Sequence, residues 1–125
     1  QETSVLLRNL VGRNHGKEFI FTVSPLRHRK DGAHGNQLSK SILILAIEDV
    51  CNAFPERCDY FPAYEILLDE LRDYRFYAED LVHPSQQAVS LIWNRFVDFA
   101  VPQSCLAGLE ARWKEARRSR HRNIH

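Results

Sequence analysis

Methionine is absent from this 125-residue chain, and glycine and proline are scarce at five residues each. So little glycine and proline excludes collagen-like and low-complexity sequence. The longest apolar run, at positions 42–47, has six residues, whereas a membrane-spanning helix needs roughly 20. Hydrophobic residues make up 44% of the chain and charged residues 26%. That composition excludes intrinsic disorder and is typical of one globular domain.

Cysteine is also rare, and neither sign of charge is in excess. The three cysteines, Cys51, Cys58 and Cys105, have no CxxC spacing, and no secretion signal opens the sequence. These features argue against a disulfide framework and a zinc knuckle, and they favour a cytoplasmic setting. Lysine plus arginine number 17 and aspartate plus glutamate 16, which gives no general attraction to nucleic acid or membranes. The three cysteines have no zinc-binding spacing, so we predict no metal and no cofactor.

The hydrophobic pattern predicts two strands among five helices. Residues 18–23 are β-branched, aromatic and nearly continuously apolar, as in a strand that is buried on both faces. In residues 36–52, apolar side chains recur at intervals of three and four residues, which favours a helix buried on most sides. Asn36 is the expected N-cap of this helix. The expected order is helix 2–11, strand 18–23, helix 36–52, strand 58–61, and helices 63–71, 85–99 and 104–119.

A helical crossover of this length requires the two strands to be parallel, with a right-handed connection. Parallel sheets occur inside α/β proteins, and a typical sheet has about five or six strands. We therefore predict an α/β domain whose first strands are missing. The start at Gln1 and the lack of methionine agree with a piece of a longer or processed protein.

Asp80 and His83, just before Pro84, are the most informative pair in the sequence. In a loop that enters a helix, the Asp80 carboxylate can hold one ring nitrogen of His83 protonated. The other nitrogen is then free to act as a general base. The alternative is a surface aspartate and a histidine that merely suits the turn, because so short a motif is not specific.

Longer runs agree in order and spacing with one known family. They are residues 22–28, 31–33, 36–41, 60–66, 69–80, 83–85 and 92–93. On these residues the chain resembles the GSCFA family, of the SGNH hydrolase superfamily, over roughly residues 18–99. Residues 37–40 (Gln-Leu-Ser-Lys) resemble the bacteroidete branch of that family, so we expect a bacterial protein.

The resemblance implies a doubly wound, flavodoxin-like α/β domain of three layers, with a parallel sheet in the middle, that acts as a serine esterase or acyl hydrolase. Asp80 and His83 match the acid and base of its Ser-His-Asp triad. The nucleophilic serine and the oxyanion-hole glycine and asparagine belong to earlier blocks, which this sequence lacks. We therefore expect residues 1–103 to be the C-terminal part of such a domain, inactive alone, and residues 104–125 to be a basic helix or tail.

No serine of this chain is a good substitute for the nucleophile. Ser24 follows the first strand, where α/β active sites form, but it lacks the glycine-flanked elbow of such nucleophiles. Ser85 is better interpreted as a helix cap.

Three further residues are candidate contacts for a small-molecule or carbohydrate ester. Arg27 and His28 follow the first strand at its carboxyl end, where α/β proteins bind ligands. Arg75 lies in the charged and aromatic run before Asp80. The alternatives are a solvated loop for Arg27 and His28, and a hydrogen-bonded network around residues 72–80 that positions Asp80 and His83.

A second function stays open, that of a non-catalytic interaction module. A two-stranded sheet leaves an unpaired edge along residues 18–23, which invites pairing with another chain or a homo-oligomer. Residues 112–125 carry six bases and one acid. A solvated terminus explains this better than contact with nucleic acid or membrane, and we predict neither partner.

Overall fold

The computed structural model describes residues 2–122. The chain divides into two compact units, Gln1–Ile92 and Trp93–His125. Within the described range, no helix combines the length and the apolar character needed to cross a membrane.

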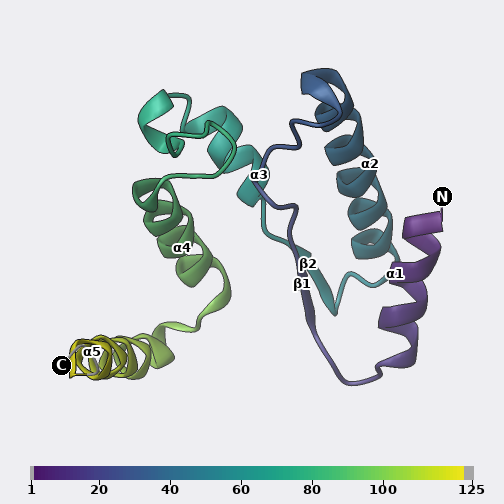
Figure 1. The fold of residues 1–125 in the computed structure, drawn as a ribbon. Helices are drawn as coiled ribbons and strands as arrows, with labels where there is room; N and C mark the ends of the chain where they lie inside the picture. The colour runs from purple at the N-terminus through teal and green to yellow at the C-terminus, as the bar shows by residue number, and fades with distance from the viewer. Residues whose placement is uncertain (1, 123–125) are drawn as a thin grey trace. The chain divides into compact units, whose positions relative to one another are not determined.

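The first unit contains two short parallel strands joined by a long helix (Figure 1). β1 (Phe19–Phe21) pairs with β2 (Cys58–Tyr60), with Phe19 opposite Cys58 and Phe21 opposite Tyr60. α2 (Gly32–Ala53) makes the crossover between them. The predicted strand–helix–strand arrangement of an α/β protein is confirmed, and flanking helices complete the unit.

The remaining elements of this unit lie before β1 and after β2. α1 (Glu2–Arg13) comes first, and Gly16, at φ +78°, turns the chain toward β1 in a left-handed conformation that glycine adopts readily. After β2 come α3 (Ala63–Glu65), the π-helical η1 (Ile66–Glu70), the 3-10 helix η2 (Tyr74–Phe76) and the first part of α4 (Gln86–Ala100).

Apolar side chains of α1 and α2 pack on the strands. Val11 of α1, Val50 of α2 and Cys58 of β2 form one buried cluster, against which the side chains of Phe19 and Phe21 pack. A second buried cluster consists of Val23, Ile47 and Tyr64. Side chains alternate along a strand, so the one between Phe19 and Phe21 points to the other face. That residue, Ile20, is 44% exposed, so the prediction that this strand is buried on both faces is wrong.

The helix α2 begins earlier than its apolar pattern predicted, at Gly32. Residues 32–34 are exposed, and apolar periodicity gives no signal for an exposed first turn. Asn36 is therefore inside the helix, and it is buried. Its side-chain oxygen accepts the backbone N–H of His28 at 2.8 Å, so its predicted role as an N-cap is wrong.

One face of α2 is apolar and exposed. Leu38, Ile42 and Leu45 recur at helical spacing and are 52%, 58% and 69% exposed. The prediction that this helix is buried on most sides is therefore wrong. Its buried residues lie on the face that meets the strands and the loop after β1.

A third buried cluster supports the stretch between α3 and α4. It consists of Leu67, Phe76 and Ala88, with Leu71, Tyr77 and Ile92 packed against it. Residues 77–85, which connect η2 to α4, are thus anchored by buried side chains on both sides of the connection.

The second unit continues α4 and adds η3 (Gln103–Cys105) and α5 (Leu106–Arg122). The rings of Trp93 and Trp113 stack with their centroids 5.6 Å apart and line a cavity of about 320 Å³. The predicted last helix is present. The end of the predicted basic tail, residues 123–125, lies outside the described residues.

Candidate active site

The connection between η2 and α4 folds back on itself as a closed loop around Asp80 and His83. Tyr77 and Pro84 face each other in an antiparallel bridge. The N–H of Ala78 donates to the carbonyl of His83 at 2.8 Å. The bridge fixes both ends of the turn, and the buried cluster around Phe76 and Leu67 supports it.

Within this turn the Asp80 carboxylate accepts three hydrogen bonds. Its Oδ1 accepts the backbone N–H groups of Val82 and His83 at 2.9 and 3.0 Å, and its Oδ2 lies 2.6 Å from Nδ1 of the His83 ring. Aspartate favours such local bonds because its short side chain reaches the backbone two and three residues ahead. The N–H groups of His83 and Val82, and then the His83 ring, hold the pKa of Asp80 well below its ordinary value.

This low pKa assigns the proton on the His83 ring. An ionised carboxylate only accepts hydrogen bonds, so Nδ1 of His83 must donate to Oδ2 of Asp80. In the neutral imidazole, Nε2 then carries a lone pair. The His83 side chain is 62% exposed. The pair is therefore arranged as a general base with its orienting carboxylate, and it is open to an incoming group.

Between the two residues, Leu81 adopts a left-handed backbone with φ +56°. This conformation costs a branched L-residue roughly 1–2 kcal/mol. The N–H of Leu81 donates to the carbonyl of Ala78 at 2.9 Å, and the bonds to Asp80 hold the next two residues. Strained backbone of this kind persists only where its surroundings hold it, and it concentrates at functional sites.

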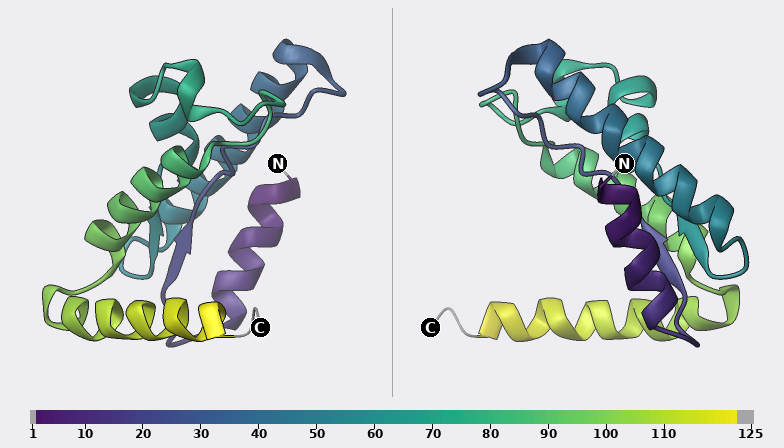
Figure 2. Two further views of the ribbon diagram at one scale, coloured as in Figure 1. Left: turned by 60° about the vertical axis from the view of Figure 1, so that its left-hand side comes forward. Right: turned by 90° about the vertical axis from the view of Figure 1, so that its right-hand side faces the viewer.

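The loop after β1 lies beside this turn, as Figure 2 shows from two sides. The backbone N–H of Arg27 donates to the carbonyl of Val82 at 3.2 Å. The Arg27 guanidinium lies 4.1 Å from the ring centroid of Tyr77, and its Nη1 donates to the carbonyl of Leu81 at 3.5 Å. The structure thus brings Arg27 to the turn that carries Asp80 and His83.

Comparison with known proteins identifies the family of the chain. The model of the GSCFA family matches residues 1–96. The chain belongs to the GSCFA family. That family is part of the SGNH hydrolase superfamily. The match includes the whole turn and the loop after β1, and α5 lies outside it. No curated protein and no solved structure matches the chain.

The other two candidate contacts of this GSCFA chain have different surroundings. The His28 side chain is exposed, and its backbone N–H is held by Asn36. Arg75 is exposed as well, with its guanidinium 4.8 Å from the Phe76 ring centroid and 3.7 Å from the Asp73 carboxylate. Among the described contacts of both residues, none is with Asp80 or His83.

The two serines considered as nucleophiles have structural roles. Ser85 Oγ accepts the N–H of Ala88 at 3.3 Å, so its interpretation as the cap of α4 is confirmed. Ser24 Oγ accepts the N–H of Leu26 at 3.2 Å, two residues ahead.

Sequence reasoning missed a buried lysine behind the loop after β1. Lys40 is 3% exposed, and its ammonium donates to the carbonyl of Ser24 at 2.7 Å. Burial lowers the pKa of Lys40. Lys40 and Asn36 lie one helical turn apart on the inner face of α2, and both bond the backbone of this loop. Two polar residues at that spacing on a mostly apolar helix were the signal that could have revealed them.

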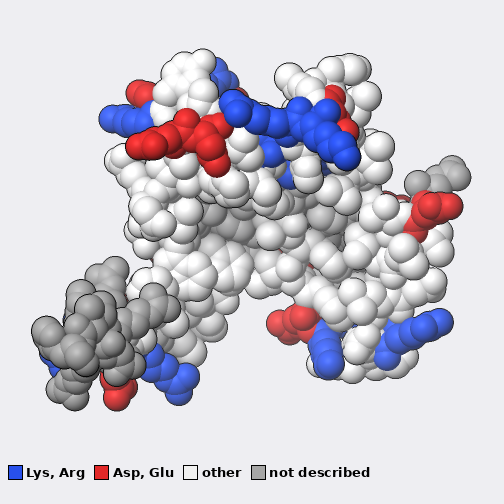
Figure 3. Space-filling view, viewed as in Figure 1, with Lys and Arg blue, Asp and Glu red and all other residues white. Residues whose placement is uncertain are grey.

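Basic side chains gather near this loop. Arg27, Arg29 and Lys30 follow one another at short intervals. Figure 3 shows lysine and arginine side chains, with acidic side chains beside them, at the end of the unit that carries the loop.

Proposed function

We propose that this chain supplies the histidine and aspartate of a Ser-His-Asp triad in an SGNH-type serine esterase or acyl hydrolase. The observation that supports this is the Asp80–His83 pair, whose Oδ2 and Nδ1 atoms lie 2.6 Å apart in a turn that fixes both residues. Membership of the GSCFA family supports it independently.

In this mechanism Nε2 of His83 takes the proton of the serine hydroxyl as the serine oxygen attacks the ester carbonyl. The imidazolium that forms is stabilised by the Asp80 carboxylate, and it then gives the proton to the departing alcohol oxygen. Water attacks the acyl-enzyme in the second half of the reaction, with His83 again as the base. The carboxylic acid leaves, and the serine is restored.

The nucleophilic serine and the oxyanion hole are proposed to come from sequence that precedes Gln1 in the complete protein. Ser85 and Ser24 are less suitable, because both hydroxyls already accept backbone N–H groups. We propose a small-molecule or carbohydrate ester as the substrate. His28 and Arg75 remain candidate contacts for it, because both side chains are exposed near the carboxyl end of β1 or the catalytic turn.

Hydrolysis of short acyl esters by the protein that includes its upstream sequence tests this proposal. His83→Ala is expected to lower kcat by more than about 10⁴-fold, because both proton transfers lose their carrier. His15→Ala, at an exposed histidine in the turn after α1, is the matched control and is expected to retain full activity. Undiminished activity of His83→Ala would show that the triad assignment is wrong.

A non-catalytic module that self-associates is the second candidate. It is supported by the two-stranded sheet, since within the described residues β1 and β2 pair only with each other. Their outer edges are then available to a second copy. Light scattering coupled to size-exclusion chromatography distinguishes the candidates. A dimer that dissociates when proline replaces Ile20 would favour the module, and a stable monomer would count against it.

A further inference from the structure

Arg27 touches the catalytic turn through three separate contacts. Its backbone N–H bonds the Val82 carbonyl at 3.2 Å, its guanidinium bonds the Leu81 carbonyl at 3.5 Å, and the same group lies on the Tyr77 ring at 4.1 Å. Tyr77 in turn pairs with Pro84 at the base of the turn. One side chain therefore contacts both the tip of the turn and its base.

The loop that carries Arg27 is itself held from behind by α2. The buried Lys40 ammonium bonds the carbonyl of Ser24, and the buried Asn36 side chain bonds the N–H of His28. Burying an ammonium and an amide is favourable only when they are hydrogen-bonded, so these contacts fix the loop on both sides of Arg27. Arg27 thus contacts the turn from a loop that α2 holds in place.

The turn needs such support. Leu81 is held at φ +56°, and His83 and Asp80 are 62% and 47% exposed, so little packing restrains their side chains. The Leu81 carbonyl, which Arg27 bonds, belongs to the strained residue itself. A contact at that carbonyl acts directly on the backbone that sets the distance between Asp80 and His83.

We propose that Arg27 is a positioning residue for His83, and that it is not a ligand for the substrate. Its guanidinium holds Leu81 and Tyr77 in place, so that Nδ1 of His83 stays on Asp80 and Nε2 keeps one direction. The guanidinium already lies over the Tyr77 ring and bonds the Leu81 carbonyl, and a lysine ammonium does not reproduce this pair of contacts. This role rests on the proposed function for its effect on catalysis, but its effect on the His83 ring does not.

A matched control exists at the opposite end of β1 and β2. Arg57 is half-buried like Arg27, and its guanidinium lies 5.3 Å from the Phe54 ring centroid and bonds the carbonyl of Val11 at 2.8 Å. It makes the same kinds of contact without touching the turn. Substituting each arginine by glutamine therefore removes equivalent interactions at two places.

The first experiment records the imidazole ¹⁵N and Nδ1–H proton signals of His83 by NMR in the full chain. Arg27→Gln and Arg27→Lys are expected to broaden or shift the Nδ1–H signal, and Arg57→Gln is expected to leave it unchanged. Tyr77→Leu, which keeps an apolar side chain but removes the aromatic face, is expected to act in the same direction and serves if Arg27→Gln does not fold. An unchanged His83 signal in folded Arg27→Gln or Tyr77→Leu would overturn the proposal.

The second experiment measures ester hydrolysis by the protein that includes its upstream sequence. Arg27→Gln is expected to lower kcat by up to about 100-fold, because misplacing a base by a fraction of an ångström slows proton transfer, with KM within about twofold. A raised KM with unchanged kcat would make Arg27 a substrate ligand and overturn the proposal. If His83→Ala leaves activity intact, the triad itself fails, and the NMR result still decides the positioning role of Arg27.

Discussion

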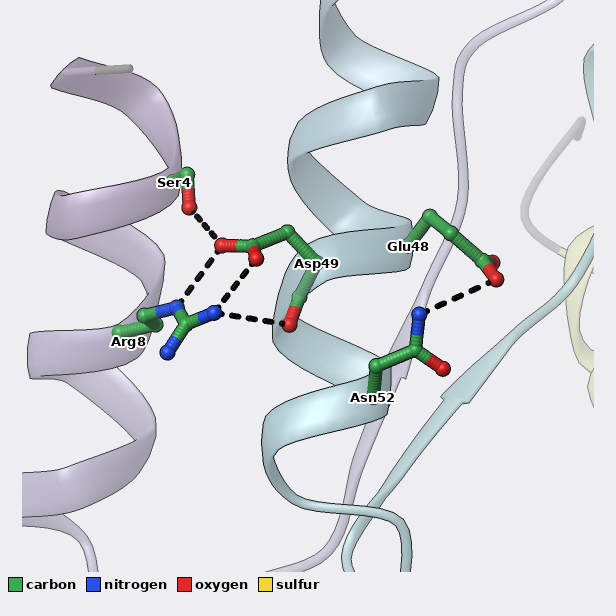
Figure 4. Close-up of polar contacts among 5 residues, drawn as sticks. All are labelled: Ser4, Arg8, Glu48, Asp49 and Asn52. Atoms are coloured by element: carbon green, nitrogen blue, oxygen red, sulfur yellow. Dashed lines mark hydrogen bonds and ion pairs between the residues drawn. The ribbon is translucent and has the colours of Figure 1, made fainter.

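Two carboxylates of the first unit, Asp80 and Asp49, both have a pKa below the ordinary range, but their surroundings differ. Asp80 is held by the backbone N–H groups of His83 and Val82 and by the His83 ring, all within one turn. Asp49 of α2 is held by the guanidinium of Arg8 and the hydroxyl of Ser4, both on α1, and its pKa falls to about 2 (Figure 4). One site is built from neighbouring residues, and the other bridges two helices.

The two carboxylates are therefore suited to different roles: Asp80 to orienting His83, and Asp49 to holding α1 on α2. Because the donors to Asp80 lie within three residues of it, its charge depends on the local turn and is available to orient His83. Arg8 Nε donates to Asp49 at 2.8 Å from 41 residues away, so that charge is stabilised only while α1 lies on α2. Both side chains of the Arg8–Asp49 pair are nearly half exposed, and exposed ion pairs contribute little to stability.

The largest expected contrast comes from replacing each carboxylate by an amide. Asp80→Asn is expected to lower kcat of the complete protein by about 10⁴-fold, because an amide that turns its NH₂ toward His83 stabilises the wrong tautomer. Asp49→Asn makes the same chemical change at the other carboxylate whose pKa is lowered, and it is expected to leave kcat unchanged. Steady-state hydrolysis of a short acyl ester measures both. Equal losses in the two variants would mean that the comparison between the sites is wrong.

A smaller contrast is expected from the buried side chains beneath the two regions. Leu67 is fully buried in the cluster that supports the turn, and Val50 is fully buried between α1, α2 and β2. Leu67→Ala is expected to lower the free energy of unfolding by about 2–5 kcal/mol, through lost burial and the cavity that remains. Urea denaturation measures this change.

The same two variants show whether each cluster supports only its own region. In folded protein, Leu67→Ala is expected to disturb the Nδ1–H signal of His83, because the turn loses part of the buried cluster that supports it. Val50→Ala also removes buried apolar atoms but is expected to leave that signal in place. A disturbed His83 signal in Val50→Ala would show that the two regions are coupled through the core.

The parts of the site that follow from neighbouring residues could be predicted from sequence. Asp80 and His83 are three residues apart, and an aspartate side chain in a turn can reach a residue at that spacing. The cap formed by Ser85 is equally local. The parallel strands followed from the length of the crossover, because a long helical connection returns the chain in the same direction.

The contacts that hold the site together could not be predicted, because they join distant residues. Arg27 and Leu81 are 54 positions apart, and Lys40 and Ser24 are 16 apart. No local pattern says which carbonyl a buried ammonium will meet. The left-handed backbone of Leu81 is also invisible in sequence, since leucine is not a residue that predicts it.

The smallest expected effect concerns the pH dependence of the α1–α2 contact. The pKa of Asp49 is about 2 in the folded chain and near 3.8 without its partners. A carboxylate whose pKa is lowered by folding stabilises the folded state at pH values above its unfolded pKa. This stabilisation is lost as the pH falls through its folded pKa. Asp49→Asn is therefore expected to lower the urea midpoint slightly at pH 7, and most of this difference from the unchanged chain is expected to be gone near pH 2.

The comparison of these two chains across pH isolates Asp49 from the other acids. The difference between their urea midpoints is expected to be constant above about pH 5 and to shrink between about pH 5 and pH 1. Asp80 is present in both chains, so its own titration cancels in the difference. A difference at pH 2 as large as the difference at pH 7 would mean that Asp49 acts through packing, and that the charge on Asp49 does not attach α1 to α2.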